Sequence, residues 1–442
     1  MKTNSLTTKI VVFLFCFSFQ MGVNAQERLV FSKEELISDF KYLCSSMKND
    51  HPDLFAYLPE SEYQKSKMQV FNSIQDSMSV EKFYLLIAPF VASLKNGHMN
   101  VSIPIISRIQ FLNNGGLAFP LKVNIADDRL FVSVDLSKEQ NVPVNAELLS
   151  INGIPSSEIL KQMFGLMGAE INNEIKYSQI SSYFSTLLWY IYHFENDYQL
   201  VILENDNKKD IHLQGITQKQ YTEMMNNKKT FQNNQNPYNF RIDSLKNAAY
   251  LKIQSFADAD KLSEFLKTSY QQLQSNHIDS LIIDVRDNGG GNSSSLDSLM
   301  NYLTDKPYKQ YNKIFLKVSE DVKNVYKERH PDTYNEIKNL PNGQIYNFDN
   351  PFTEPKKQCM TYSGKIIVYV NDKTFSGAST FASLIDCLQI GTIIGHTGSP
   401  KIYCADFLKL KLPDTKIDYT VPIKEFYDCG TELVSKVVKK TF

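Results

Sequence analysis

The 442-residue chain has little glycine and proline, no excess of charge of one sign and few cysteines. Its 18 glycines and 16 prolines are too few for a collagen-like or linker-rich protein. It has 47 Lys and Arg against 48 Asp and Glu, with both signs scattered, so it lacks the basic surface that nucleic-acid binding requires. The 42% of hydrophobic residues instead predicts large folded cores.

Long hydrophobic runs are also scarce. The run Ile10 to Phe19 is about half as long as a membrane-spanning helix, and no later run approaches that length. It lies between Lys2 and Lys9 on one side and the small-residue exit Val23-Asn24-Ala25 on the other. This order predicts a cleavable signal peptide at residues 1–25, no membrane span, and a secreted or periplasmic protein.

The five cysteines beyond this segment are widely spaced. An odd number at wide spacing predicts neither a dense disulfide framework nor a metal-binding pair, and the seven histidines show no metal-ligand spacing. We therefore expect no metal and no other cofactor. Buried free thiols are favoured, and one bridge among the last four cysteines stays open. The five residues are Cys44, Cys359, Cys387, Cys404 and Cys429.

The hydrophobic pattern changes along the chain and predicts four parts. Residues 27–100 are helical in period, and residues 110–165 alternate as short strands with a hairpin turn at Asn152-Gly153. Residues 166–246 form a helical and connecting region. Within that region a strand is expected at 198–203, and a solvated loop or helix is expected at 205–239.

Residues 247–442 alternate between strands and helices. Strands are predicted at 248–253, 280–285, 365–370 and 391–394, with helices at 258–274, 294–303 and 376–387 between them. Strands that are separated by helices of ten or more residues imply a mostly parallel α/β core.

Two strand ends carry candidate chemistry. The apolar strand Leu281–Val285 runs into Gly289-Gly290-Gly291, where the backbone N–H groups can approach a phosphate or an oxyanion. The strand at 365–370 leads to Ser376, which lies at a sharp turn before a helix, with the N–H of Gly377 beside it. That serine is either a nucleophile or an ordinary helix N-cap. A third candidate, His98, lies where helices give way to strands, and there a capping or surface role is the alternative.

At these segments the sequence resembles the C-terminal processing and tricorn-type serine peptidases, peptidase family S41. Asp284–Gly290 resembles the strand and glycine signature of the family, and Thr374–Ser379 resembles its nucleophile turn. Asn96-Gly97-His98 is similar to its Asp-Gly-His element, and Tyr250–Phe256 is similar to its opening strand. All four occur in the order of the family.

The resemblance implies a fold and a mechanism. The fold is a crotonase-like, spirally wound α/β core with an N-terminal helical domain and a PDZ-like module at about 110–165, where a peptide would add as an extra strand. In the mechanism Ser376 attacks a peptide carbonyl and His98 takes its proton. The N–H groups of Gly377 and of Gly289 or Gly290 hold the oxyanion.

The resemblance leaves the base and its orienting acid open. Some members use a lysine about 25 residues beyond the nucleophile, and an ungapped comparison puts Lys401 there. His98 is favoured because Gly97-His98 matches the histidine type, and His396 is a third candidate. Tricorn-type members have a serine where this chain has Gly97. Glu432 lies in about the right region for their distal glutamate.

The expected substrate is a peptide or an unfolded protein, and the sequence carries no prediction of the oligomeric state. A histidine base predicts activity that rises through a pKa near 6 to 7. Two other functions stay open: a non-catalytic peptide-binding protein on a peptidase scaffold, and an esterase that uses the same serine.

Overall fold

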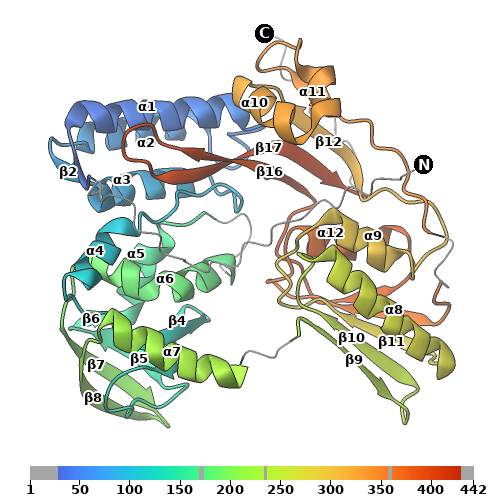
Figure 1. Ribbon diagram of the computed structural model, residues 1–442, viewed down its shortest axis with the longest axis horizontal. Helices are drawn as coiled ribbons and strands as arrows, with labels where there is room; N and C mark the ends of the chain where they lie inside the picture. Colours follow the sequence, from blue (N-terminus) through green and yellow to red (C-terminus); the bar gives the residue numbers. More distant parts are fainter. Residues whose placement is uncertain (1–27, 169–173, 233–235, 357–360, 430–442) are drawn as a thin grey trace, which may run out of the picture.

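The computed structural model describes residues 28–168, 174–232, 236–356 and 361–429 (Figure 1). The predicted signal peptide, Cys359 and Glu432 lie outside these residues. None of the described helices is long and apolar enough to cross a membrane.

The first part of the described chain is helical, as the periodicity predicted. Helix α1 begins with a capping box, in which Ser32 and Glu35 each bind the backbone of the other. The apolar faces of the helices pack into one core that includes Leu36, Phe40 and Leu43. The short strands β1 (Val30–Phe31) and β2 (Met78–Ser79) pair antiparallel beside it. The helices are α1 (Lys33–Asp50), α2 (Glu60–Ser73) and α3 (Val80–Ala92).

A six-stranded antiparallel sheet follows, in the order β3-β4-β5-β7-β8, with β6 paired to β5. The hairpin turn at Asn152-Gly153 is confirmed: both residues have positive φ, and Ile151 pairs with Ile154. Strand β7 confirms the strand expected at 198–203. The strands are β3 (Leu121–Ala126), β4 (Arg129–Asp135), β5 (Glu147–Ile151), β6 (Ile154–Pro155), β7 (Asp197–Glu204) and β8 (Asn207–Gln214).

Strand β8 corrects the expectation of a loop or helix for the whole of 205–239. It is an edge strand with mostly exposed polar side chains, so its sequence lacks the apolar alternation of a half-buried strand. The helix α7 (Gln218–Gln232) follows it. The other helices of this part are α4 (Ile106–Asn113), α5 (Ser156–Phe164) and α6 (Glu174–Tyr192).

The predicted α/β alternation is confirmed by a five-stranded sheet in the order β15-β14-β11-β10-β9. Strands β10, β11, β14 and β15 run parallel, and β9 is antiparallel at one edge. Figure 1 shows α8, α9 and α12 grouped over this sheet, and their apolar side chains share its core. The elements are β9 (Tyr238–Asp243), β10 (Ala248–Ile253), α8 (Ala259–Ser275), β11 (Ser280–Asp284), α9 (Ser293–Met300), β14 (Lys365–Tyr369), α12 (Gly377–Cys387) and β15 (Thr392–Ile394).

A second, four-stranded sheet has the order β13-β12-β17-β16. Its pairings are antiparallel. This sheet was not predicted, because its strands come from separate parts of the chain. The elements are β12 (Tyr311–Lys317), α10 (Glu320–Arg329), α11 (Pro331–Ile337), β13 (Ile345–Asn347), β16 (Ile402–Lys411) and β17 (Asp418–Asp428).

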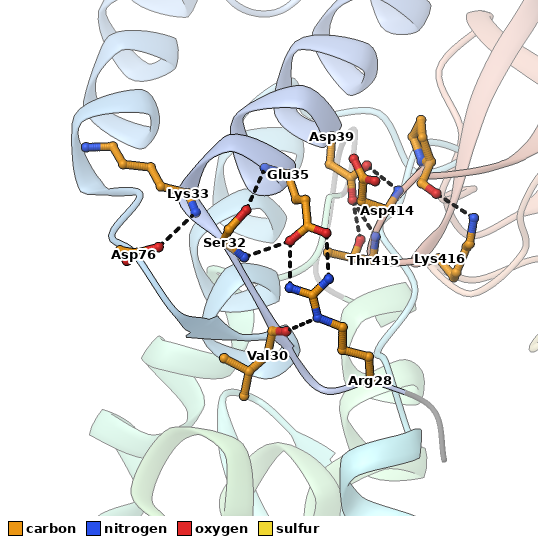
Figure 2. Close-up of polar contacts among 11 residues, drawn as sticks. Arg28, Val30, Ser32, Lys33, Glu35, Asp39, Asp76, Asp414, Thr415 and Lys416 are labelled. Carbon is orange, nitrogen blue, oxygen red and sulfur yellow. Dashed lines mark hydrogen bonds and ion pairs between the residues drawn. The ribbon is translucent and has the colours of Figure 1, made fainter. Parts of the chain in front are cut away.

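The β16–β17 hairpin contacts both the N-terminal helices and the α/β part of the chain. In Figure 1 it extends beneath α1, and its tip residues Leu412, Ile417 and Tyr419 belong to the core of the N-terminal helices. The fully buried carboxylate of Asp39 in α1 accepts hydrogen bonds from the backbone of Asp414 and Thr415 at the tip (Figure 2). The hairpin therefore holds the helical part against the α/β part.

The structure also selects one of the open cysteine pairings. Cys387 at the end of α12 and Cys429 after β17 form a disulfide, with a Cα–Cα distance of 6.2 Å. Cys44 and Cys404 are buried, and neither forms a disulfide with another described cysteine.

Candidate active site

Ser376 lies on a strained turn between β14 and α12. Its φ of 51° and ψ of −128° are unusual for a residue with a side chain, and such strain is typical of functional sites. Its hydroxyl does not cap α12 and makes no hydrogen bond to any described residue. The alternative of an ordinary N-cap is therefore wrong, and the hydroxyl is available for chemistry.

The turn is held in place by its own backbone and by a neighbouring loop. The Ser376 carbonyl oxygen accepts from the N–H groups of Ser379 and Thr380, at 2.8 and 3.0 Å. The Ser376 N–H donates to the hydroxyl of Ser399 at 2.9 Å, and the N–H of Gly398 donates to the carbonyl of Thr374 at 2.8 Å. No local pattern marks Ser399, because its contact with Ser376 spans 23 residues.

The glycine segment after β11 packs directly against Ser376. The Phe375 N–H donates to the carbonyl of Asn288 at 3.0 Å. A Cβ atom on Gly290 would lie 2.7 Å from the Phe375 carbonyl oxygen and 2.8 Å from the Gly377 nitrogen, so only glycine fits there. The two motifs that were predicted from separate strands thus form one surface.

The N–H groups of the three predicted oxyanion residues differ. The Gly290 N–H donates to the side-chain oxygen of Asn288 at 2.9 Å. Within the described residues the N–H groups of Gly289 and Gly377 have no acceptor, and Gly377 begins α12, where the helix dipole favours negative charge. Gly289 and Gly377 are therefore the better placed donors.

His98 reaches the same place from the N-terminal part of the chain. Its imidazole stacks on the ring of Phe375, the residue before Ser376, with the ring centroids 5.0 Å apart. It also stacks on Tyr403 of β16, at 6.2 Å. Its carbonyl oxygen accepts from the hydroxyl of Thr420 on β17 at 2.9 Å. The surface or capping role is therefore less consistent with the structure than a place in the site.

Burial lowers the pKa of His98 to about 4, although the charge of Asp406 and a hydrogen bond with the Cys404 backbone act in the opposite direction. The expectation of a pKa near 6 to 7 is therefore wrong, because it assumed a solvated imidazole. His98 is neutral at physiological pH and is able to accept a proton.

The other candidate bases lie elsewhere. The side chains of Lys401 and His396 are exposed. The Lys401 carbonyl oxygen accepts from the N–H of Asp428 at 2.9 Å, and its charge lowers the pKa of that buried carboxyl. Burial is the larger effect and raises the pKa of Asp428 to about 6. The Asp428 carboxyl accepts from the hydroxyls of Thr380 and Ser383 in α12.

Within the described residues, no group of three or more His, Cys, Asp or Glu side chains could hold a metal ion. The chemistry that the described groups can carry out is proton transfer and nucleophilic attack: a free serine hydroxyl, a neutral imidazole nearby and two unpaired N–H groups.

Comparison with known proteins gives the same assignment for the C-terminal part. Residues 247–428 match the model of peptidase family S41. Among solved structures, a CPAF mutant superimposes with a TM-score of 0.61 at 14% identity, over 89% of this chain and 89% of that chain. Mature CPAF complexed with lactacystin gives a TM-score of 0.60 at 14% identity, over 90% and 93%. At such identity these structures support the fold alone. The α/β fold and the match at 247–428 thus confirm the resemblance of the motifs, and residues 247–428 form a domain of the peptidase family S41 type.

Proposed function

We propose that this protein is an exported serine endopeptidase that cleaves peptides or unfolded proteins through an acyl-enzyme on Ser376. The observation that carries the proposal is the turn at Ser376, which leaves the hydroxyl without a bond to described residues and places it beside the glycine segment and Phe375. The S41 domain makes a peptide bond the expected target.

In the proposed mechanism His98 is the general base. The neutral imidazole takes the proton of the Ser376 hydroxyl as the oxygen attacks the peptide carbonyl, and then gives it to the leaving amine. In the free protein the hydroxyl is not bonded to the imidazole, and such bonds often tighten only when substrate is bound. The charge of Asp406 acts on the imidazole, and the backbone of Cys404 forms a hydrogen bond with it.

The oxyanion would be held by the N–H groups of Gly377 and Gly289. Both are free of described acceptors, whereas the Gly290 N–H is already bound to Asn288. Removal of one such donor from an oxyanion hole typically costs 10²- to 10³-fold in kcat.

The finer architecture belongs to the same proposal. We infer a crotonase-like core, an N-terminal helical domain and a PDZ-like module that begins with β3 and β4. The module would bind a peptide as an added strand. The signal peptide proposed at residues 1–25 predicts that the protein appears in the periplasmic or extracellular fraction.

A serine-reactive phosphonate tests the central claim. It should label wild type and the Ser298→Ala control, whose serine is half-buried on α9, but not Ser376→Ala. Hydrolysis of a peptide and of a matched ester, measured on the same proteins, separates a peptidase from an esterase. Equal labelling of Ser376→Ala would refute the nucleophile. Peptide binding by wild type without labelling or turnover would favour the non-catalytic peptide-binding alternative.

A further inference from the structure

The buried side chain of Asn96 joins three segments of the chain behind His98. Asn96 lies in the turn after α3 and is 3% exposed. Its Oδ1 accepts from the backbone N–H of His98 at 2.8 Å. Its Nδ2 lies 3.5 Å from the Cys404 carbonyl oxygen on β16 and 3.3 Å from Nε2 of His51, at the end of α1.

We infer that Asn96 is a positioning residue for His98, which holds the backbone of the histidine and the strand segment beside its imidazole in one fixed relation. The inference rests on the proposed function of His98 as the base. Asn96 itself does not touch the reacting atoms and acts only through the histidine.

The side-chain amide of Asn96 contacts both the backbone of His98 and the strand beside its imidazole. Through Oδ1 it fixes the backbone from which the imidazole extends. Through Nδ2 it contacts Cys404, whose backbone in turn contacts the imidazole, while the adjacent Tyr403 stacks on it. A shift of β16 relative to the turn would therefore lengthen the contact of Asn96 with Cys404 and change the surroundings of the imidazole.

The surroundings explain why an uncharged side chain suits this position. The buried His51 faces Asn96, and burial lowers the pKa of His51. Asn96, His51, Cys404 and Glu425 of β17 line one cavity of about 110 Å³. Asp406 follows Cys404 on the adjacent β16, and Lys317 of β12 donates a hydrogen bond to the carbonyl of His51. A carboxylate in place of the amide would be buried between His51 and the backbone of His98, and its charge would favour protonation of both imidazoles.

Three variants test the inference. Asn96→Leu removes all three polar contacts of the side chain with little change in volume, and Asn96→Asp keeps an acceptor for the His98 N–H. Asn301→Leu is the matched control: its asparagine, directly after α9, is also buried, and its Oδ1 also accepts one backbone N–H, from Lys356. The readouts are kcat and KM for a peptide, the pH dependence of phosphonate labelling at Ser376, and the imidazole signals of His98 in NMR spectra.

For Asn96→Leu we expect a loss of about 10²-fold in kcat with KM within about twofold, because a misplaced base weakens the chemical step and not ground-state binding. Asn96→Asp should recover most of kcat at high pH and move the acidic limb of labelling to higher pH. Asn301→Leu should keep the wild-type kcat and pH profile. A purely structural role would instead lower the melting temperature of both leucine variants and leave the pH profile of Asn96→Asp unchanged.

A folded Asn96→Leu protein with wild-type kcat would overturn the inference. If that variant does not fold, Asn96→Asp decides: an unchanged pH profile and unchanged His98 signals overturn it equally. If wild type is not labelled at all, the proposed function fails. The His98 signals then remain as a separate test, because they report the environment of the imidazole without any turnover.

Discussion

The imidazole of His98 stacks on the ring of Phe375, the residue that directly precedes Ser376, with a centroid distance of 5.0 Å. One residue comes from a turn after the N-terminal helices and the other from the turn before α12. The contact brings the proposed base to the proposed nucleophile, and the β16–β17 hairpin, which contacts both parts, maintains it.

The first prediction concerns the base. The rate constant kcat/KM should rise as the pH passes about 4 and be level by neutral pH, because the imidazole accepts a proton only above its lowered pKa. His98→Ala should lose about 10²- to 10⁴-fold, whereas Lys401→Ala should be mild. Kinetics of both variants across pH check this. A dead Lys401→Ala beside an active His98→Ala, with activity only at alkaline pH, would make lysine the base.

The second prediction concerns the glycine segment. Gly290→Ala should abolish turnover and destabilise the fold, because its Cβ would meet the backbone of Phe375 and Gly377 at less than 3 Å and its φ is +93°. Gly289→Ala is the matched control: nothing lies within 4 Å of its Cβ, and alanine keeps the N–H. Thermal unfolding and phosphonate labelling measure both effects. A labelled, stable Gly290→Ala protein would contradict the packing described here.

The third prediction concerns the attachment of the hairpin in Figure 2. Asp39→Ala leaves three donors of the tip without their acceptor: the N–H groups of Asp414 and Thr415 and the Thr415 hydroxyl. We expect a loss of about 3 kcal/mol or more in the free energy of unfolding. Asp76→Ala, which removes one exposed contact to Lys33, should cost less than about 1 kcal/mol. Urea unfolding compares them, and equal losses would show that the tip is not specifically held.

The fourth prediction concerns the buried carboxyl of Asp428. Its pKa is about 6 in the folded protein and ordinarily 3.8, so the folded state binds the proton more tightly. This contribution to stability is present below pH 3.8 and is lost as the pH rises through 6. Asparagine cannot ionise, so the stability of Asp428→Asn relative to wild type should improve by about 2 kcal/mol between pH 4 and pH 8.

Urea unfolding at the two pH values measures this difference. The control is Asp418→Asn, since Asp418 is exposed and pairs with Lys411 at 3.0 Å. A difference between Asp428→Asn and wild type that does not vary with pH would mean that the pKa of the carboxyl is not raised in the folded protein.

Local sequence determined the parallel strands and the positions of the chemistry at their ends. Strands β10, β11 and β14 are short apolar runs between helical segments, and their boundaries agree with the expected ones to within about a residue. Ser376 and the glycines follow from the same pattern, since the turn at each strand end depends on adjacent residues. Strand β8 and the second sheet were not predicted, because polar edge strands and pairings between distant segments leave no local period.

Only the tertiary structure decided which groups surround the serine. The stacking of His98 on Phe375, the contact of Ser399 with Ser376, the contacts of Asn96 and the pairing of Cys387 with Cys429 all depend on segments far apart in the chain. The low pKa of His98 was equally beyond the sequence, because it arises from burial against Phe375 and Tyr403. A residue type sets which chemistry is available, whereas packing sets how close the groups lie and how much water reaches them.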